Sequence, residues 1–387
     1  MQLLSRHAEC LFWLGRYIER TSSLARILLV QTAFDRGRAS GSGWSWLLTL
    51  FDDADDFAKR YPEPSSRNVI RYYLNDRENL GSVVGSLGAA RANARALRAM
   101  VSTEFWMQIN RTYRRVDALP SELESESRLA QTCEQIQTDC YALLGIAQST
   151  FYRDAGWRFF ELGLEIERAD QMSRLLDVRF AQIQAGTAEH GDTLGDFTHW
   201  SMLLRACGGH HAFRRLVSGP LQPMNIAQFL IFEQSFARSI AHCAMEIDGT
   251  VTQLRTHCGL PTPSRLLKRI SDLHDLLHLA QRDPGLVRYL HGFNDAVQRE
   301  LIALTNDLAV CYFGLEDQAL AATAATSVPS ETTPPRPPAQ GSQSQSQDQS
   351  QKQGQSQSQS QDRSQATATA APTTTTSRSQ AKNQPSD

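Results

Sequence analysis

One helical segment occurs twice in this chain. Residues 12–30 read FWLGRYIERTSSLARILLV, and residues 160–178 read FELGLEIERADQMSRLLDV. Five residues recur at a constant spacing of 148 positions: Gly15, Ile18, Glu19, Arg20 and Arg26 match Gly163, Ile166, Glu167, Arg168 and Arg174. In both segments apolar residues return every three or four positions, which is typical of a helix packed along one side. The chain must therefore accommodate two related amphipathic helices.

Further matches follow these helices in the same order. Trp44 and Phe57 correspond to Trp200 and Phe213, and Tyr72 and Ser82 correspond to Phe229 and Ser239, with a spacing that drifts to 156 or 157 residues. Ordered matches with small drifts are expected when loops differ in length between two copies of one unit. The sequence thus predicts two copies of one helical unit, over residues 1–150 and 151–318.

The remaining segments also favour helices. Residues 81–103, 122–149, 233–251, 264–282 and 285–313 are rich in strong helix formers, and proline or glycine residues separate them. No stretch shows sustained strand alternation. We therefore expect an all-α protein, a duplicated helical bundle.

The C-terminal segment has a different composition. From residue 323 to 387 it consists mostly of Ala, Thr, Pro, Ser and Gln, and residues 341–365 read GSQSQSQDQSQKQGQSQSQSQDRSQ. Such a segment has almost no apolar surface to bury, so burial cannot offset the entropy lost on ordering. We predict a disordered tail over residues 323–387.

Composition also limits the class of protein. A formal net charge of −2 argues against nucleic-acid or membrane-surface binding, and no apolar run approaches the roughly 20 residues that span a bilayer. The first ten residues, MQLLSRHAEC, carry charges where a secretory signal would be apolar. The seven cysteines are odd in number and form no CxxC pair. Free thiols in a cytoplasmic protein are the expectation.

Charged residues border the apolar side of both repeated helices. At about 100° per residue, Gly15, Glu19 and Arg26 fall on one narrow stripe, and the residues 148 positions later repeat it. Glycine inside a helix costs stability, which close approach of another helix or of a ligand would offset. A carboxylate and a guanidinium beside a buried surface should pair. We expect Glu19 to pair with Arg16, Arg20 or Arg26, and Glu167 with Arg168 or Arg174.

Two interpretations of these stripes remain open. Paired Glu and Arg can fix helix register as a purely structural network. The surroundings are also rich in arginine, which suits a carboxylate or phosphate ligand; the residues are Arg6, Arg16, Arg20, Arg26, Arg153, Arg158, Arg168 and Arg174. Since the second helix is the more acidic, Glu167→Gln is expected to cost more stability and Glu19→Gln more function.

Other chemistry has little support in the sequence. His274 and His278 lie one helical turn apart, but Asp275 follows the first, so the HExxH pattern of zinc proteases is absent. There is no phosphate-binding glycine loop, nucleophile elbow or dinucleotide fingerprint. The sequence predicts neither a metal nor a cofactor.

Four segments together resemble the bacterial alpha-E domain family: LSRHAECLFWLGRYIERTSSLAR, ARANARALRAMVSTEFWMQIN, RDAGWRFFELGLEIERADQMSRLL and FLIFEQSFARSI. The resemblance covers residues 1–313 and excludes the tail. It implies an all-helical cytoplasmic protein that works with an ATP-grasp-type ligase and a transglutaminase-like protein, in a system that forms or modifies peptides. The family's motif residues would be Glu19, Arg20, Glu167 and Arg168, together with Arg6, Arg153, Asp154, Gly156 and Trp157.

Two functions are compatible with these observations. The first is a non-catalytic helical partner that binds the ligase or presents its peptide substrate. The second is an enzyme that acts on a peptide or amide intermediate through a Glu-Arg site. The absence of an evident set of nucleophile and base favours the partner.

Overall fold

The computed structural model describes residues 4–35, 41–120, 126–190 and 193–315. Every regular element in these ranges is a helix, which confirms the predicted all-α class. The predicted tail, residues 323–387, and the last residues of the second predicted unit lie outside the described ranges. None of the described helices combines the length and apolarity that a membrane span requires.

The helices form two consecutive sets. The first comprises α1 (Ser5–Asp35), η1 (Gly41–Trp44), α2 (Trp46–Phe51), α3 (Ala54–Ala58), α4 (Ser66–Leu74), α5 (Val83–Ala96), α6 (Thr103–Asp117) and α7 (Glu126–Thr150). The second comprises α8 (Ala155–His190), α9 (Thr193–Ala206), α10 (His210–Leu216), α11 (Pro223–Phe232), α12 (Ile240–Thr256), α13 (Ser264–Gln281), η2 (Leu286–Tyr289), α14 (Leu290–Leu308) and the π-helical turn η3 (Ala309–Phe313).

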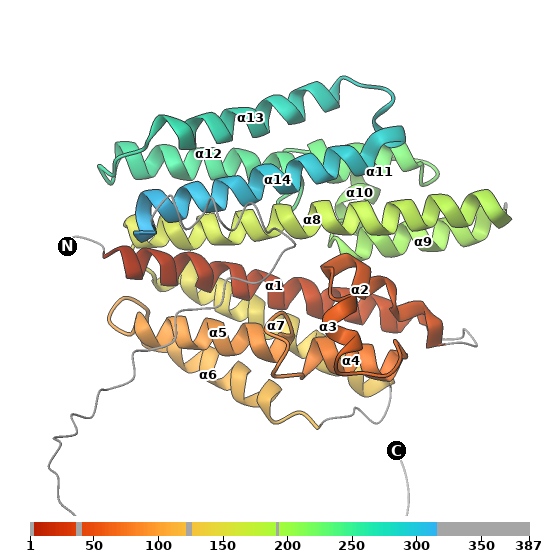
Figure 1. Cartoon of the computed structure of the whole chain (residues 1–387), viewed down its shortest axis with the longest axis horizontal. Helices are drawn as coiled ribbons and strands as arrows, with labels where there is room; N and C mark the ends of the chain where they lie inside the picture. Colours follow the sequence, from red (N-terminus) through yellow and green to blue (C-terminus); the bar gives the residue numbers. More distant parts are fainter. Residues whose placement is uncertain (1–3, 36–40, 121–125, 191–192, 316–387) are drawn as a thin grey trace, which may run out of the picture. The chain divides into compact units, whose positions relative to one another are not determined.

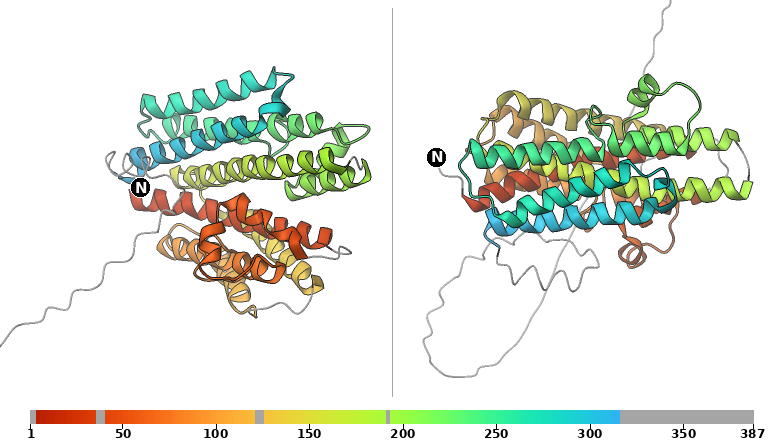
Figure 2. Two further views of the ribbon diagram at one scale, coloured as in Figure 1. Left: turned by 45° about the vertical axis from the view of Figure 1, so that its right-hand side comes forward. Right: turned by 90° about the horizontal axis from the view of Figure 1, so that it is seen from above.

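The two long Glu-Arg helices, α1 and α8, pack against each other in the middle of the helical unit (Figure 1). On one side α1 contacts α5 and α7, and α6 packs on both of these helices. On the other side α8 contacts α12 and α14, and α13 packs on both. Seen from above, α12 lies toward one side of the α1–α8 pair and α14 toward the other (Figure 2). The repeated segments therefore form the central interface.

Serine caps define the start of α5 and of α12 in the same way. The Ser82 hydroxyl accepts a hydrogen bond from the Gly85 amide (3.0 Å) and donates one to the Asp76 carbonyl oxygen (2.7 Å). The Ser239 hydroxyl accepts from the His242 amide (3.1 Å) and donates to the Glu233 carbonyl oxygen (2.7 Å). A serine at this position satisfies an amide that the first turn of a helix leaves unpaired.

These caps also explain where the predicted helices were too long. The helix expected over residues 233–251 begins only at Ile240, because Ser239 caps it and residues 233–239 form a connection. The helix expected over residues 81–103 ends at Ala96, and Ser102 caps α6 instead. Local side-chain bonds of serine compete with the helical pattern, so such residues end or begin a helix.

Candidate functional site

Two glycines bring α1 and α8 into main-chain contact. A Cβ atom added to Gly15 would collide with the carbonyl oxygen of Phe160 and lie 3.1 Å from the Leu164 amide nitrogen. A Cβ atom added to Gly163 would collide with the carbonyl oxygen of Phe12 and lie 3.2 Å from the Arg16 amide nitrogen. The expectation of a close approach at these glycines is confirmed, and the group that approaches each glycine is the facing helix.

Glu167 of α8 is fully buried and is held by two arginines of α1. Its carboxylate accepts hydrogen bonds from Arg16 Nε (2.7 Å) and from Arg20 Nε (2.7 Å) and Nη2 (3.2 Å). The amide of Gln171, one turn later on α8, donates a further bond of 3.2 Å. All of these hydrogen bonds except the one from Gln171 therefore join α1 to α8.

Glu19 of α1 is held in a reciprocal way. Its carboxylate accepts a hydrogen bond from Arg168 Nη2 of α8 (3.2 Å) and another from Arg238, which precedes the cap of α12. The Ser23 hydroxyl donates a bond of 3.2 Å and in turn accepts one from Arg238 (3.1 Å). Arg168 also pairs with Glu165, one turn before it on α8 (2.7 Å). The glutamate of each Glu-Arg dipeptide thus pairs with the arginine of the other.

The expected pairing within each helix is therefore wrong for the hydrogen bonds of Glu19 and Glu167, although Arg26 is near enough to Glu19 to help lower its pKa. The helices touch at the glycines, and the carboxylates follow one turn later on the same stripe, so each points across the contact. A guanidinium on the facing helix is then closer than the neighbours in sequence. Pairing within a helix does occur further along, where Arg174 Nε binds both oxygens of Asp170 at 3.1 Å.

The arginines keep both buried carboxylates ionised. Burial alone would raise the pKa of Glu19, but Arg238, Arg168 and Arg26 outweigh it and lower the pKa to about 2. For Glu167 the same balance between burial and the cations Arg20 and Arg16 also gives a pKa of about 2. An ionised carboxylate in a low-dielectric interface strongly disfavours loss of its cations. The network therefore fixes how α1 sits on α8.

Four of the predicted site residues lie away from this network. Arg6 is exposed on the first turn of α1. Asp154 caps α8, since its carboxylate accepts from the amides of Gly156 (2.9 Å) and Trp157 (3.2 Å). The Arg153 guanidinium lies 3.6 Å from the centre of the buried Trp157 ring. The segment RDAGW thus starts α8, about three turns before Glu167.

Arg238 is the network residue that sequence reasoning missed. It lies 219 residues from Glu19 and precedes the cap of α12, inside a segment that was expected to be helical. An arginine directly before a capping serine was the available signal. It did not reveal the contact, which depends on how α12 packs on α8.

Four of the seven cysteines are buried and poorly nucleophilic. All seven are free, as the sequence predicted. Burial raises the pKa of Cys133 and of Cys207 to about 12, and it raises the pKa of Cys140 and Cys243 well above the ordinary value. Only the thiolate is strongly nucleophilic, so these four thiols are unreactive near neutral pH. Within the described ranges no three His, Cys, Asp or Glu side chains are grouped so that they could hold a metal.

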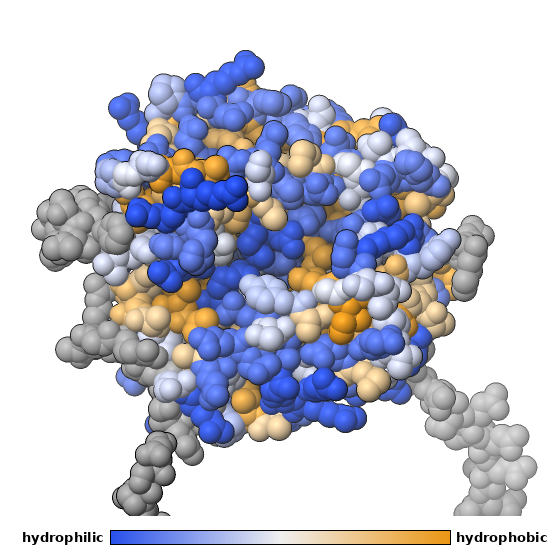
Figure 3. All heavy atoms as spheres, turned by 180° about the vertical axis from the view of Figure 1, so that it is seen from behind, coloured by the Kyte–Doolittle hydropathy of each residue, from blue (hydrophilic) through white to orange (hydrophobic). Residues whose placement is uncertain are grey.

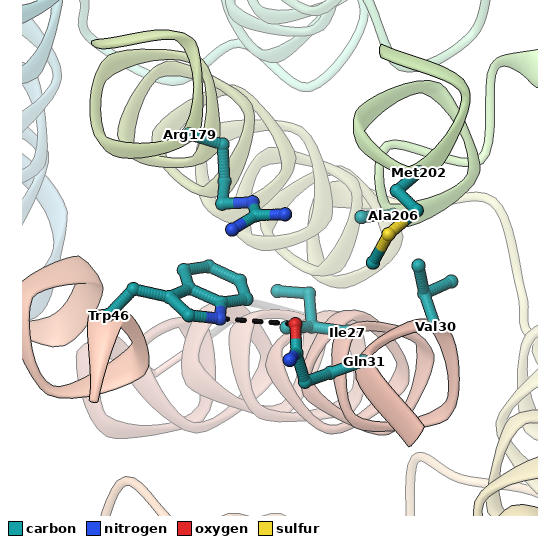
Figure 4. A pocket seen from close by; sticks show the side chains of 7 residues that line it. All are labelled: Ile27, Val30, Gln31, Trp46, Arg179, Met202 and Ala206. Atoms are coloured by element: carbon teal, nitrogen blue, oxygen red, sulfur yellow. Dashed lines mark hydrogen bonds between the residues drawn. The ribbon is translucent and has the colours of Figure 1, made fainter. Parts of the chain in front are cut away.

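A small pocket lies near the C-terminal part of α1 (Figure 4). The space in it that a molecule the size of water can occupy is about 10 Å³. The Trp46 indole donates to Gln31 (3.1 Å), and the Arg179 guanidinium lies 4.5 Å from the centre of the Trp46 ring. The other lining residues are Ile27, Val30, Met202 and Ala206. A space of this size holds at most about one water molecule, so we interpret it as a packing gap.

A family model, Alpha-E, described as a predicted alpha-helical domain with a conserved ER motif, matches residues 3–313. The chain belongs to the Alpha-E family. Its sequence contains the Glu-Arg dipeptide twice, at residues 19–20 and 167–168. These two dipeptides supply both buried carboxylates and two of their arginine partners. The ER motif of this Alpha-E protein therefore lies in the α1–α8 interface.

Relatives of this Alpha-E chain occur in mycobacteria. It is 24% identical over 281 residues to an uncharacterized protein of Mycobacterium bovis and to uncharacterized proteins of two strains of Mycobacterium tuberculosis. The match covers 67% of this chain but only 31% of each relative, so the chain spans about a third of the length of these relatives. No solved structure matches the chain.

Proposed function

We propose that this chain is a cytoplasmic helical partner of an ATP-grasp-type peptide or amide ligase, which it binds or to which it presents a peptide substrate. The observation that carries this proposal is the reciprocal Glu-Arg network. Both carboxylates are buried, ionised and occupied by arginines, so neither is available as a general base or nucleophile. A binding role is compatible with such a closed network, whereas catalysis by these carboxylates is not.

The lengths of the mycobacterial relatives support a role beside another protein. The region similar to this chain accounts for 31% of each relative, so there it belongs to a much longer polypeptide. A helical unit that is joined to further sequence in one protein can act on a separate partner in another. The resemblance to the alpha-E family suggests the ligase, and also a transglutaminase-like protein, as these partners.

We also propose that the chain arose from two copies of one unit, over residues 1–150 and 151–318. Three features support this: the spacing of 148 residues, the matching contacts of α1 and α8 with the helices beside them, and the equivalent caps at Ser82 and Ser239. Two copies would place one Glu-Arg dipeptide on each side of a common interface, which accounts for their reciprocal pairing.

Reconstitution tests the partner role. An ATP-grasp-type ligase from the same organism is incubated with ATP and candidate peptides, with or without the full chain, and products are measured by mass spectrometry. We expect the chain to co-purify with the ligase and to change product yield several-fold. Heat-denatured chain is the control. Absence of both binding and any change in yield would refute the proposal, and product formed by the chain without ligase would favour the enzymatic alternative.

A further inference from the structure

Arg26 and Arg174 occupy positions 148 residues apart but have different partners. Arg174 binds the carboxylate of Asp170, four residues before it. At the position that matches Asp170, the first helix has Ser22, and Arg26 reaches its hydroxyl only at 3.5 Å. The other hydrogen-bond partner of Arg26 is the Tyr141 hydroxyl, at 3.3 Å. Within the described part of the chain, Arg26 therefore makes no hydrogen bond to a carboxylate as its counterpart does, although the charge of Glu19 is near enough to interact with it.

Arg26 also stands close to two further arginines. A Cβ atom placed on Gly208 would lie 3.4 Å from Arg238 Cδ and 3.6 Å from Arg26 Nε, so both side chains converge beside this glycine. Arg168 and Arg238 share the carboxylate of Glu19. Arg168 Nε is buried and has no hydrogen-bond acceptor among the described residues.

Positive charge exceeds negative charge in this cluster. Three arginines, Arg26, Arg168 and Arg238, surround the ionised Glu19, and burial raises the pKa of the remaining carboxyl group, Glu165, despite its pairing with Arg168. The pKa of Arg238 is lowered to about 10, mainly by burial. The charges of Arg26 and Arg168 lower it further, and Glu19 offsets these effects only in part. An unbalanced buried cation is costly unless an anion accompanies it.

The cluster lies next to exposed residues at Gly208 and Tyr141. Arg26 itself is only 6% exposed, but Gly208 is exposed, and Tyr141 on α7 is 53% exposed. Gly208 has a left-handed backbone (φ 72°), which favours glycine, and a side chain there would lie against Arg26 and Arg238. On the face opposite to that of Figure 1, hydrophilic residues line the middle and hydrophobic residues form separate patches (Figure 3).

We propose that Arg26, Arg238 and Tyr141 form a binding site for an oxyanion, the carboxylate or phosphate group of a small ligand, which enters beside Gly208. Guanidinium groups bind such groups through paired, charge-assisted hydrogen bonds, and the phenol adds a donor. The anion takes the place that Asp170 occupies beside Arg174. This site is a property of the chain alone and does not depend on a ligase.

Binding is measured on the full chain by thermal melting and calorimetry, with sodium phosphate and sodium glutamate as separate probes and sodium chloride at equal ionic strength as the reference. We expect saturable stabilisation by at least one probe. Stabilisation by phosphate alone identifies a phosphate site, and stabilisation by glutamate identifies a carboxylate site. If neither probe stabilises the chain beyond chloride, the proposal is wrong.

Three variants locate the site. Arg26→Gln should weaken binding about tenfold to hundredfold, the usual effect of losing a charge-assisted hydrogen bond. Ser22→Asp should weaken it similarly, because it supplies Arg26 with the carboxylate that Arg174 already has. Arg174→Gln is the matched control and should bind like the unmodified chain. The proposal would be overturned if Arg26→Gln and Ser22→Asp both bound the probe as tightly as the unmodified chain does. If neither variant folds, Tyr141→Phe at the exposed edge decides by the same criterion.

Discussion

Gly15 and Gly163 meet at the crossing of α1 and α8, and each lies against a main-chain carbonyl group of the facing helix. No larger residue fits at either position without separating the helices. The separation would also lengthen the hydrogen bonds that Glu19 and Glu167 accept one turn later. The glycines and the charged network thus depend on the same close contact.

Gly163→Ala should therefore destabilise the chain. The added methyl group collides with the Phe12 carbonyl, and main-chain atoms cannot move aside as a flexible side chain can. We expect a loss of about 1–3 kcal/mol in the free energy of unfolding, measured by chemical denaturation.

Gly145→Ala on α7 is the control for this substitution. A Cβ atom there has nothing within 4 Å, so alanine should stabilise the helix by about 0.5–1 kcal/mol. If Gly163→Ala were no less stable than Gly145→Ala, the crossing of α1 and α8 would tolerate a side chain.

Thiol labelling tests whether the cysteines are reactive. In the folded chain at pH 8, the buried residues Cys133, Cys140, Cys207 and Cys243 should resist iodoacetamide, because burial raises the pKa of each thiol. All seven cysteines should react after unfolding. Mass spectrometry of the labelled peptides identifies the modified residues, and rapid labelling of any of the four in the folded chain would contradict the assigned burial.

The sequence predicted the stripes but not their partners. Helical periodicity alone places Gly15, Glu19 and Arg26 on one side of α1, because the angle per residue is fixed. The angle and register at which α1 crosses α8 depend on packing of the whole unit, and these decide that Glu19 meets Arg168 rather than Arg20. Glycine on the stripe was the useful signal, since it indicated a close contact before the contacting group was known.

Local motifs were harder to interpret. Asp154 and Trp157, which the family resemblance placed among the site residues, serve to start α8 and to pack its first turn. A long helix needs a defined beginning, so a residue of such a motif does not by itself indicate a ligand site. Arg238 lies in FLIFEQSFARSI, one of the segments that resemble the family, but no role was predicted for it, and only the packing of α12 on α8 brings it to Glu19.

Stability should fall in acid because of the two buried carboxylates. Glu19 and Glu167 have a pKa of about 2 when folded, below the ordinary value of 4.5 that applies when unfolded. Their contribution is fully present above pH 4.5 and is lost as the pH falls toward 2, on the order of 3 kcal/mol per carboxylate. Unfolding free energies measured between pH 2 and 6 should show this slope.

Single substitutions show which carboxylates cause the fall in unfolding free energy in acid. Glu19→Gln and Glu167→Gln should each flatten the slope, since glutamine does not titrate. Glu161→Gln, which removes a partly exposed pair with Arg158, should leave it nearly unchanged, because exposed pairs contribute little. An unaltered slope in both buried-site variants would mean that other carboxylates cause the acid sensitivity.

The two buried carboxylates should not contribute equally. The acidity of the second helix alone favours Glu167 as the more important for stability, whereas the partners that the structure gives each carboxylate favour Glu19. Glu167→Gln removes the carboxylate that binds Arg16 and Arg20, but the negative charge of Asp170 remains near Arg20. Glu19→Gln leaves Arg168 and Arg238 beside Arg26, with Glu165 as the remaining carboxyl group.

We therefore expect both variants to lose stability on the scale of a broken buried ion pair, about 3–5 kcal/mol, with the larger loss for Glu19→Gln. Denaturation midpoints of the two variants, measured at pH 7 and the same salt concentration, give the comparison. Adding Arg238→Met to Glu19→Gln should recover part of the loss, because it removes one unpaired buried cation. Equal losses, or no recovery in the double variant, would show that the surplus of positive charge around Glu19 does not determine its contribution.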